Sequence, residues 1–354
     1  MNRLVTFIIT SLLISACGKG MDPFFQGYGY GKNPYQRFLY LADSNSEVSV
    51  YSIDPNSGTM NFTGKSVNIG ASPVNILVDP SNQYVEVSTP TNVTSFAINS
   101  WDGSLSNLGT VATGAGPQGI VTDPTGRFFY TANATADNVS MFSITNGVLA
   151  ALTPSAVLAG TGTTGIVFDP TGRFAYVTNS TDNTVSRYDV NGTTGILSGE
   201  STHTTGGNAP TGVQIAHGKF LYIANFSDNT ITTSSIDQTT GVPTLIHTDA
   251  TGTGTQYIYT DINQNFLYTL NGAANTVSVY TINPSTGLLS AGAVVNTGAT
   301  PQFMCIDSWN RYAYIANTSG QTVSIYTINP SNGALSNIAT VPLAFAPLGI
   351  AITK

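Results

Sequence analysis

A tyrosine recurs along most of this chain at intervals of 46 residues, so an internal repeat is the strongest constraint on the fold. Five of these tyrosines open a phrase that ends in asparagine three positions later, and the phrase at Tyr40 ends in Asp43. A further copy is recognised by its turn, residues 79–83, which matches residues 169–173 and places Glu86 where the others have tyrosine. The tyrosines that mark the other six copies are Tyr40, Tyr130, Tyr176, Tyr222, Tyr268 and Tyr314.

Each repeat reads as four short strands. Residues 165–168 form an apolar strand, residues 169–173 a turn, and a second strand passes through Tyr176 before a third at residues 185–190. A Pro- and Gly-containing turn, such as residues 283–287, then reverses the chain into a fourth strand. Four antiparallel strands per repeat make a propeller blade. The sequence therefore predicts an all-β fold, a seven-bladed β-propeller.

The two ends of the repeat region predict how the ring closes. The first repeat starts at its second strand, residues 37–40, and lacks an inner strand. The missing strand is supplied by residues 347–352, which match residues 117–122 of a complete repeat. We therefore expect one propeller domain over residues 37–354, in which the C-terminal strand joins the first blade and leaves no exposed edge.

The N-terminus reads as an export signal. Arg3 precedes an apolar run over residues 4–14, which is typical of a signal peptide and too short for a stable membrane span. The run ends in Ile-Ser-Ala-Cys at Cys17, which resembles the bacterial lipobox. We predict a signal peptide (1–16), then a lipidated Cys17 and tether (17–36), with membrane lipid as a partner. Gly18, in place of Asp, favours the outer membrane; the alternative is an ordinary secretory peptide with an incidental cysteine.

Charge and cysteine content exclude several classes. The chain has 11 Lys and Arg residues and a net charge of −7, with no basic stripe, so nucleic-acid binding is not expected. Cys17 and Cys305 are its two cysteines, so acylation of the first leaves no intramolecular disulfide. Cys305 lies in an apolar run and reads as a small buried hydrophobe.

Two motifs carry a family resemblance. The phrase Tyr-Val-Thr-Asn at Tyr176, followed by residues 183–186 and preceded by the turn at residues 169–173, resembles the YVTN-repeat β-propellers and the lactonase-like propeller family, which includes 6-phosphogluconolactonase-like proteins. The resemblance covers residues 37–354. It implies a propeller fold and, as one activity, lactone hydrolysis, although a fold does not carry its chemistry with it.

The candidate ligand site is the channel mouth. The inner strands of a propeller line its central channel, and polar residues stand at or near the start of six of them. These amides and hydroxyls are Asn75, Gln118, Thr164, Thr211, Gln256 and Gln302. They predict hydrogen bonding to a ligand rather than acid–base chemistry, and no metal or cofactor site is predicted.

A catalytic set is harder to find. A lactone hydrolase needs a base or metal-bound hydroxide and a donor for the oxyanion, and the three histidines fall away from the channel mouth. They are His203, His217 and His247. Glu86 is the one candidate general acid or base, because burial would raise its pKa. The alternative is a solvated Glu in a degenerate blade.

The remaining charged residues repeat in rings that read as structural. One Asp ring follows the inner strands and predicts turn caps, at Asp79, Asp123, Asp169, Asp261 and Asp307. A second, on the pocket face, predicts turns or sugar ligands, at Asp137, Asp182 and Asp228. The cations occupy the opposite face and argue against a phosphosugar; they are Arg37, Arg127, Arg173, Lys219 and Arg311.

Three functions follow from these residues. The leading hypothesis is a lipid-anchored cell-envelope protein that presents its propeller to bind a protein or polysaccharide partner. The second is a lactone hydrolase of the lactonase-like family, so whether the chain is an enzyme stays open. The third is a scaffold subunit of an envelope complex.

Overall fold

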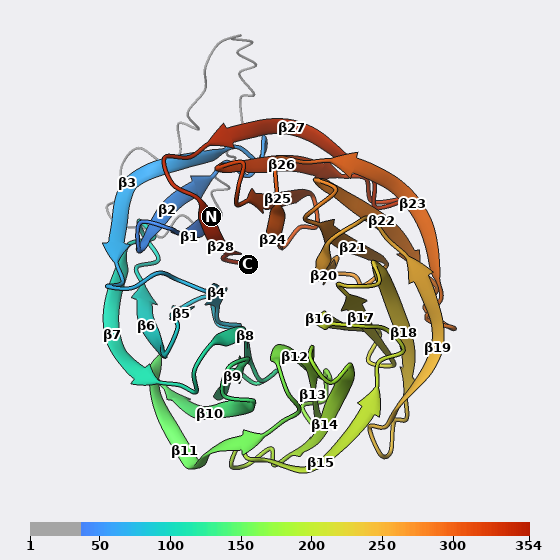
Figure 1. The fold of residues 1–354 in the computed structure, drawn as a ribbon. Coiled ribbons are helices and arrows are strands. Elements are labelled where there is room, and N and C mark those ends of the chain that lie inside the picture. The colour runs from blue at the N-terminus through green and yellow to red at the C-terminus, as the bar shows by residue number, and fades with distance from the viewer. Residues whose placement is uncertain (1–36) are drawn as a thin grey trace, which may run out of the picture. The chain divides into compact units, whose positions relative to one another are not determined.

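The computed structural model describes residues 37–354; the predicted signal peptide (1–16) and the tether with Cys17 (17–36) lie outside the described residues. Twenty-eight strands form seven four-stranded antiparallel sheets arranged as a ring around a central channel (Figure 1). The predicted seven-bladed propeller is confirmed. No helix within residues 37–354 has the length and hydropathy of a membrane span.

In six blades the four strands follow sequence order from the channel outward, and in the remaining blade the order from the channel is β28-β1-β2-β3. The inner strands are β28 (Pro347–Ile352), β4 (Asn75–Val78), β8 (Pro117–Thr122), β12 (Thr163–Phe168), β16 (Pro210–Ala216), β20 (Thr255–Thr260) and β24 (Pro301–Ile306). The second strands are β1 (Arg37–Asp43), β5 (Tyr84–Ser88), β9 (Phe128–Asn133), β13 (Phe174–Asn179), β17 (Phe220–Asn225), β21 (Phe266–Asn271) and β25 (Tyr312–Asn317). We number the blades 1 to 7 in this order.

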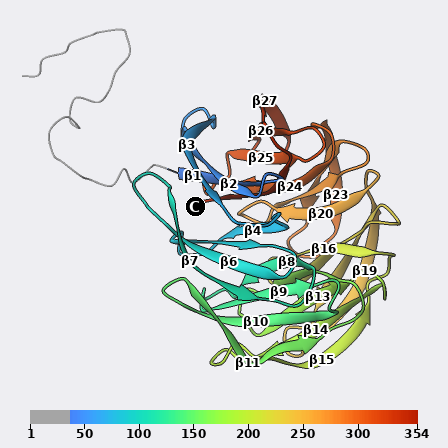
Figure 2. The same cartoon turned by 60° about the vertical axis from the view of Figure 1, so that its left-hand side comes forward.

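The outer half of each blade completes the sheet. The third strands are β2 (Glu47–Ile53), β6 (Asn92–Ile98), β10 (Asn138–Thr145), β14 (Thr184–Val190), β18 (Thr230–Ile236), β22 (Thr276–Ile282) and β26 (Thr322–Ile328). The outer strands are β3 (Met60–Asn68), β7 (Leu105–Ala112), β11 (Val148–Leu158), β15 (Leu197–Thr204), β19 (Pro243–Ala250), β23 (Leu289–Asn296) and β27 (Leu335–Pro342). The outer strands curve around the rim in Figure 2.

The ring closes inside blade 1, as predicted. Strand β28 pairs antiparallel with β1, with Leu39 opposite Ile352 and Leu41 opposite Ile350. The first blade therefore combines the last strand of the chain with its first three.

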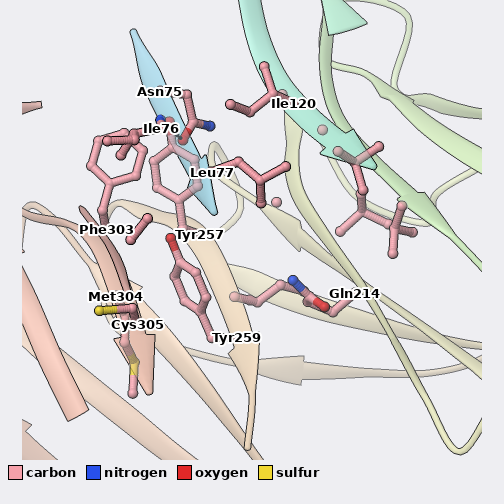
Figure 3. A pocket seen from close by; sticks show the side chains of 18 of the residues that line it. Asn75, Ile76, Leu77, Ile120, Gln214, Tyr257, Tyr259, Phe303, Met304 and Cys305 are labelled. Atoms are coloured by element: carbon pink, nitrogen blue, oxygen red, sulfur yellow. Dashed lines mark hydrogen bonds between the residues drawn. The ribbon is translucent and has the colours of Figure 1, made fainter. Parts of the chain in front are cut away.

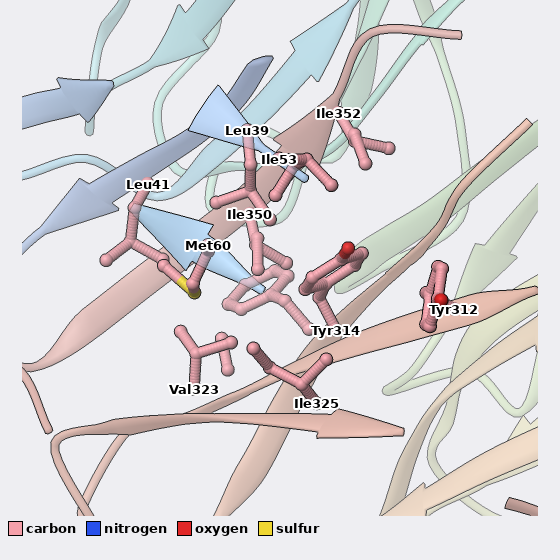
Figure 4. Packing of buried hydrophobic residues seen from close by; sticks show 12 residues of the cluster. Leu39, Leu41, Ile53, Met60, Tyr312, Tyr314, Val323, Ile325, Ile350 and Ile352 are labelled. Atoms are coloured by element: carbon pink, nitrogen blue, oxygen red, sulfur yellow. The ribbon is translucent and has the colours of Figure 1, made fainter. Parts of the chain in front are cut away.

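The core lies between neighbouring blades. Every residue of β13 is buried, because both faces of this strand pack against other blades, and its sequence is accordingly almost continuously apolar. At the closing seam, Leu39 and Met60 of blade 1 pack with Tyr314 and Val323 of blade 7 (Figure 4). Burial of such clusters along every seam supplies the main stabilisation of the ring.

The repeated tyrosine joins each blade to the next. The Tyr176 hydroxyl donates to the Gly241 carbonyl in the outer turn of blade 5 at 2.6 Å. Equivalent bonds link Tyr40 to Gly103, Tyr130 to Gly195, Tyr222 to Gly287, Tyr268 to Gly333 and Tyr314 to Gly58. This buried contact explains why tyrosine, rather than phenylalanine, occupies the repeat position.

Candidate functional site in the central channel

The central channel holds a cavity of about 620 Å³ lined by the inner strands of all seven blades (Figure 3). Its volume lies within the range of about 300–1,000 Å³ that is usual for small-molecule sites. The wall is built mainly from apolar side chains such as Leu77, Val121 and Val167. Polar groups are concentrated at a few positions, which is the usual composition of a binding pocket.

The structure brings five of the six predicted polar residues to this cavity: Asn75, Gln118, Thr164, Thr211 and Gln256. The sixth, Gln302, is not among the lining residues, and its side-chain oxygen accepts a 2.8 Å hydrogen bond from the Thr318 hydroxyl.

Three of these residues already bridge neighbouring inner strands. The Asn75 amide donates to the Gln118 carbonyl at 3.0 Å, and the Thr211 hydroxyl donates to the Gln256 carbonyl at 2.6 Å. The Thr164 hydroxyl bonds with Thr178 and with the Pro210 carbonyl. Their donors therefore hold the strands of the ring together. The side-chain amides of Gln118 and Gln256 make no hydrogen bond within residues 37–354.

Sequence reasoning missed several lining residues deeper in the channel. Tyr257 and Tyr259 of β20 lie on one wall, and the Tyr257 ring packs against Phe303 with centroids 5.1 Å apart. Burial raises the pKa of both tyrosine hydroxyls, so they are neutral donors at physiological pH. Gln214 of β16 adds an amide, and Lys354 adds the one charged side chain among the lining residues given by the structure.

Cys305 corrects a prediction. It was expected to be a buried hydrophobe, but its thiol lies on the channel wall and is partly exposed to the cavity. Burial, and secondarily Asp307, raises the thiol pKa. The group is therefore protonated and a poor nucleophile.

Glu86 does not line the cavity. It lies on β5 opposite Ser95 of β6, it is 0% exposed, and neither carboxylate oxygen has a hydrogen-bond partner within residues 37–354. Burial, with a smaller contribution from Asp79, raises its pKa well above the usual value for Glu. The alternative of a solvated Glu in a degenerate blade is therefore wrong.

Ser95 replaces the missing tyrosine hydroxyl of this blade. Its Oγ donates to the Gly147 carbonyl at 2.6 Å, the bond that tyrosine makes at the other seams. In this blade the hydrogen bond to the next blade therefore comes from β6, opposite Glu86, instead of from the second strand. The repeat spacing in the sequence did not predict this change.

The Asp ring that follows the inner strands forms turn caps, as predicted. The Asp169 carboxylate accepts the Phe174 N–H at 2.7 Å, and the Asp307 carboxylate accepts the Arg311 and Tyr312 N–H groups. Such carboxylates satisfy the backbone donors of the turn.

The second Asp ring ties loops of neighbouring blades. The Asp137 carboxylate accepts the Gly162 N–H at 2.7 Å, and the Asp228 carboxylate accepts the Asn208 N–H at 2.7 Å. Asp137 and Asn183 have positive φ, as expected for turns. The turn interpretation of this ring is confirmed.

The histidines and the cation ring lie apart from the lining residues. His203 and His247 stand on outer strands β15 and β19, and His217 in the turn after β16. The Arg127 and Arg173 side chains donate to carbonyls of the next blade, at Gly192 and Gln238. No group of three His, Cys, Asp or Glu side chains gathers as a potential metal site within residues 37–354.

Seven four-stranded blades around a lined channel define a seven-bladed β-propeller with a candidate site in its channel. The chain matches the model of the family described as lactonase, 7-bladed beta-propeller, over residues 31–254 and 248–347. It belongs to this family. No curated protein has a sequence that matches this chain.

Solved structures share the same fold. A putative 6-phosphogluconolactonase from Bacteroides uniformis has a TM-score of 0.81 at 19% identity, covering 90% of this chain and 99% of that one. A putative 6-phosphogluconolactonase from Bacteroides fragilis has a TM-score of 0.82 at 17% identity, covering 92% and 100%. The periplasmic gluconolactonase of Pseudomonas aeruginosa has a TM-score of 0.79 at 16% identity, covering 90% and 99%. At these identities the likeness establishes the fold alone.

Proposed function

We propose that this protein is a ligand-binding member of the lactonase propeller family that recognises a neutral sugar or lactone in its central channel. The observation that carries the proposal is the chemistry of the wall. Within residues 37–354 the cavity is lined by amides, hydroxyls, aromatic rings and aliphatic side chains, together with the Cys305 thiol and the Lys354 ammonium, and no carboxylate or imidazole side chain is among them. Such a wall offers hydrogen bonds and apolar contact to an uncharged ligand.

Lactone hydrolysis is the second candidate, and the family match favours it. Hydrolysis needs a general base to activate water and a donor for the developing oxyanion. Tyr257 supplies a neutral donor at the cavity, but its raised pKa makes it unsuited to act as a base near neutral pH. Glu86, the candidate from the sequence, is fully buried and does not line the cavity, although its cross-strand partner Leu77 does. The lining residues thus support the binding proposal, whereas the family match supports hydrolysis.

The proposal places the propeller at the bacterial cell envelope, held to the outer membrane by lipid on Cys17. The support is the lipobox-like end of the apolar N-terminal run. In this location the channel would bind an extracellular small molecule, or the end of a polysaccharide, and the rim would contact an envelope protein. Incorporation of labelled palmitate that is lost in Cys17→Ser tests the anchor.

Calorimetric titration of the full-length protein in detergent with glucono-δ-lactone and with neutral monosaccharides tests the binding function. Gln256→Ala should weaken binding about 5- to 10-fold, as expected for one hydrogen bond. Gln302→Ala is the matched control, because this glutamine does not line the cavity, and it should bind as the wild type does.

Hydrolysis is measured on the same panel, with 6-phosphogluconolactone added, against spontaneous ring opening. Saturable turnover above the buffer rate would replace the binding proposal with the enzymatic one. Loss of that turnover in Glu86→Gln, with the fold intact, would assign the reaction to Glu86. An absence of both binding and turnover would contradict the channel as the functional site.

A further inference from the structure

The two walls of the channel differ in chemistry. Strands β20 and β24 of blades 6 and 7 contribute the aromatic wall, on which Tyr257, Tyr259 and Phe303 lie together (Figure 3). Strands β4, β8 and β12 of blades 2 to 4 lie across the channel (Figure 1). This facing wall is aliphatic, and its side chains that are partly exposed to the cavity are Leu77, Val78, Ile120, Val121 and Val167.

Free hydrogen-bonding groups are concentrated on the side of β16 and β20, whereas on the facing wall the Gln118 amide, at the start of β8, is the one free side-chain amide within residues 37–354. The Tyr257 hydroxyl and the side-chain amides of Gln214 and Gln256 make no hydrogen bond within residues 37–354, although all three residues line the cavity. By contrast, the Asn75 amide and the Thr211 hydroxyl are engaged in bridging inner strands. Polar groups in a half-enclosed channel favour a ligand that pairs with them over one that leaves them unpaired.

The aliphatic wall favours apolar ligand surface. A fully hydroxylated sugar would place its hydroxyls against Leu77, Val121 and Val167, where they lose their hydrogen bonds to water and gain none. An alkyl group in the same place would gain about 0.8 kcal/mol per buried methylene. The two walls thus select a ligand that is polar on one edge and apolar on the other.

We infer that the channel binds an uncharged lactone that carries an alkyl substituent. The ring lies against Tyr257, where the hydroxyl and the Gln256 amide donate to the ester oxygens. The alkyl chain runs along Leu77, Val121 and Val167. This inference rests on the proposed binding function and narrows its ligand from neutral sugars and lactones to one class.

A homologous series of δ-lactones tests this ligand class. Full-length protein in detergent is titrated with δ-valerolactone, δ-hexalactone, δ-octalactone and δ-decalactone, and with glucono-δ-lactone as the hydroxylated reference. Affinity should rise about fourfold per added methylene until the wall is covered. Val167→Thr, which adds a hydroxyl at constant shape, should flatten this dependence, whereas Val190→Thr on β14, outside the cavity, should leave it unchanged.

Tyr257→Phe separates the contribution of the aromatic wall to affinity from that of the aliphatic wall. It should weaken every lactone of the series by a similar factor, about 5- to 10-fold, without changing the gain per methylene. If glucono-δ-lactone binds and the affinity of the alkyl lactones does not change with their chain length, this inference is overturned and the proposed function stands. Binding by none of the lactones or sugars would overturn both.

Discussion

The Tyr314 hydroxyl donates a 2.8 Å hydrogen bond to the Gly58 carbonyl, although the two residues are 256 positions apart in the chain. The same bond joins Tyr176 to Gly241 within the ring. The seam at which the ring closes is therefore built like an ordinary seam between consecutive blades. The stability of the closing seam therefore depends on a buried tyrosine at the same repeat position as in the other seams.

Removing the Tyr314 hydroxyl tests this equivalence. Tyr314→Phe leaves the Gly58 carbonyl without its partner in a buried seam, so the free energy of unfolding should fall by about 1–3 kcal/mol. Tyr176→Phe should have a loss of similar size. Tyr84→Phe is the control, because the Tyr84 hydroxyl makes no hydrogen bond within residues 37–354. Urea denaturation measures all three; equal stability of Tyr314→Phe and Tyr84→Phe would contradict the role of the bond.

The glycine that receives the tyrosine bond is required for steric reasons. Gly195 has φ of +74°, and a Cβ there would lie 2.3 Å from the Phe128 ring. Gly195→Ala should therefore cost roughly 2–5 kcal/mol, from left-handed backbone strain and overpacking. Gly192, in the same turn, has open space around an added Cβ, and Gly192→Ala should change stability by less than about 0.5 kcal/mol. Thermal unfolding of the pair checks the difference, and similar losses in both variants would refute the steric argument.

Glu86 should make stability depend on pH. Its pKa is raised by burial, so the folded protein keeps the proton at pH values where the unfolded chain has released it. The contribution of Glu86 to the free energy of unfolding is thus most favourable below the ordinary Glu pKa of about 4.3 and falls as the pH rises toward the folded-state pKa.

Glu86→Gln should abolish this decline and raise stability at pH 8 by about 1–3 kcal/mol, since no charge is then generated at the buried site. The measurement is urea denaturation between pH 4.5 and pH 9. Glu47→Gln, at a partly exposed glutamate of blade 1, is the control. A Glu86→Gln profile that parallels the wild type would show that the carboxyl does not titrate differently in the folded state.

Trp309 carries a second contact across the closing seam. The Arg37 guanidinium at the start of β1 lies 3.6 Å from the Trp309 ring, and that of Arg311 lies 4.6 Å from it. Trp309→Ala should lower the free energy of unfolding by about 1–2 kcal/mol through loss of both cation–π contacts.

Trp101→Ala is the matched control, because Trp101 is 53% exposed, against 40% for Trp309, and no arginine stacks on it within residues 37–354. It should change stability by less than about 0.5 kcal/mol. In Trp101→Phe, Trp309 becomes the one tryptophan of the chain and its fluorescence reports on the seam. A Trp309→Ala protein as stable as Trp101→Ala would show that the stack contributes nothing.

Most of the fold could be predicted, because the repeat shows where each strand lies along the chain. The tyrosine spacing located the blades, and the match of residues 347–352 to an inner strand located the closure. The environment of Glu86 was not predictable, because its burial depends on how blade 3 covers blade 2. The transfer of the seam bond to Ser95 was hidden for the same reason.

The channel was predicted only at its mouth. The register of the inner strands shifts between Pro210 and Val213 and between Thr255 and Tyr257. A one-residue shift exchanges the side chains that face each side of a strand, so alternation along the sequence does not tell which of them reach the cavity. Gln214, Tyr257 and Tyr259 follow these shifts and were missed for this reason. The predicted polar residues were found from their place at the strand starts, which does not depend on alternation along the strand.

The pairing of β28 with β1 also sets an order of assembly. A chain that emerges from the ribosome, or crosses a membrane, with its N-terminus first delivers β1 to β3 long before β28 exists. Until then β1 keeps an open inner edge that is free to pair with another chain. Hairpins form locally during this time, but the ring closes only when β28 pairs with β1. A frameshift or proteolytic nick that removes β28 would thus leave blades 2 to 7 complete and blade 1 without its inner strand, so that the open edge of β1 is exposed to aggregation.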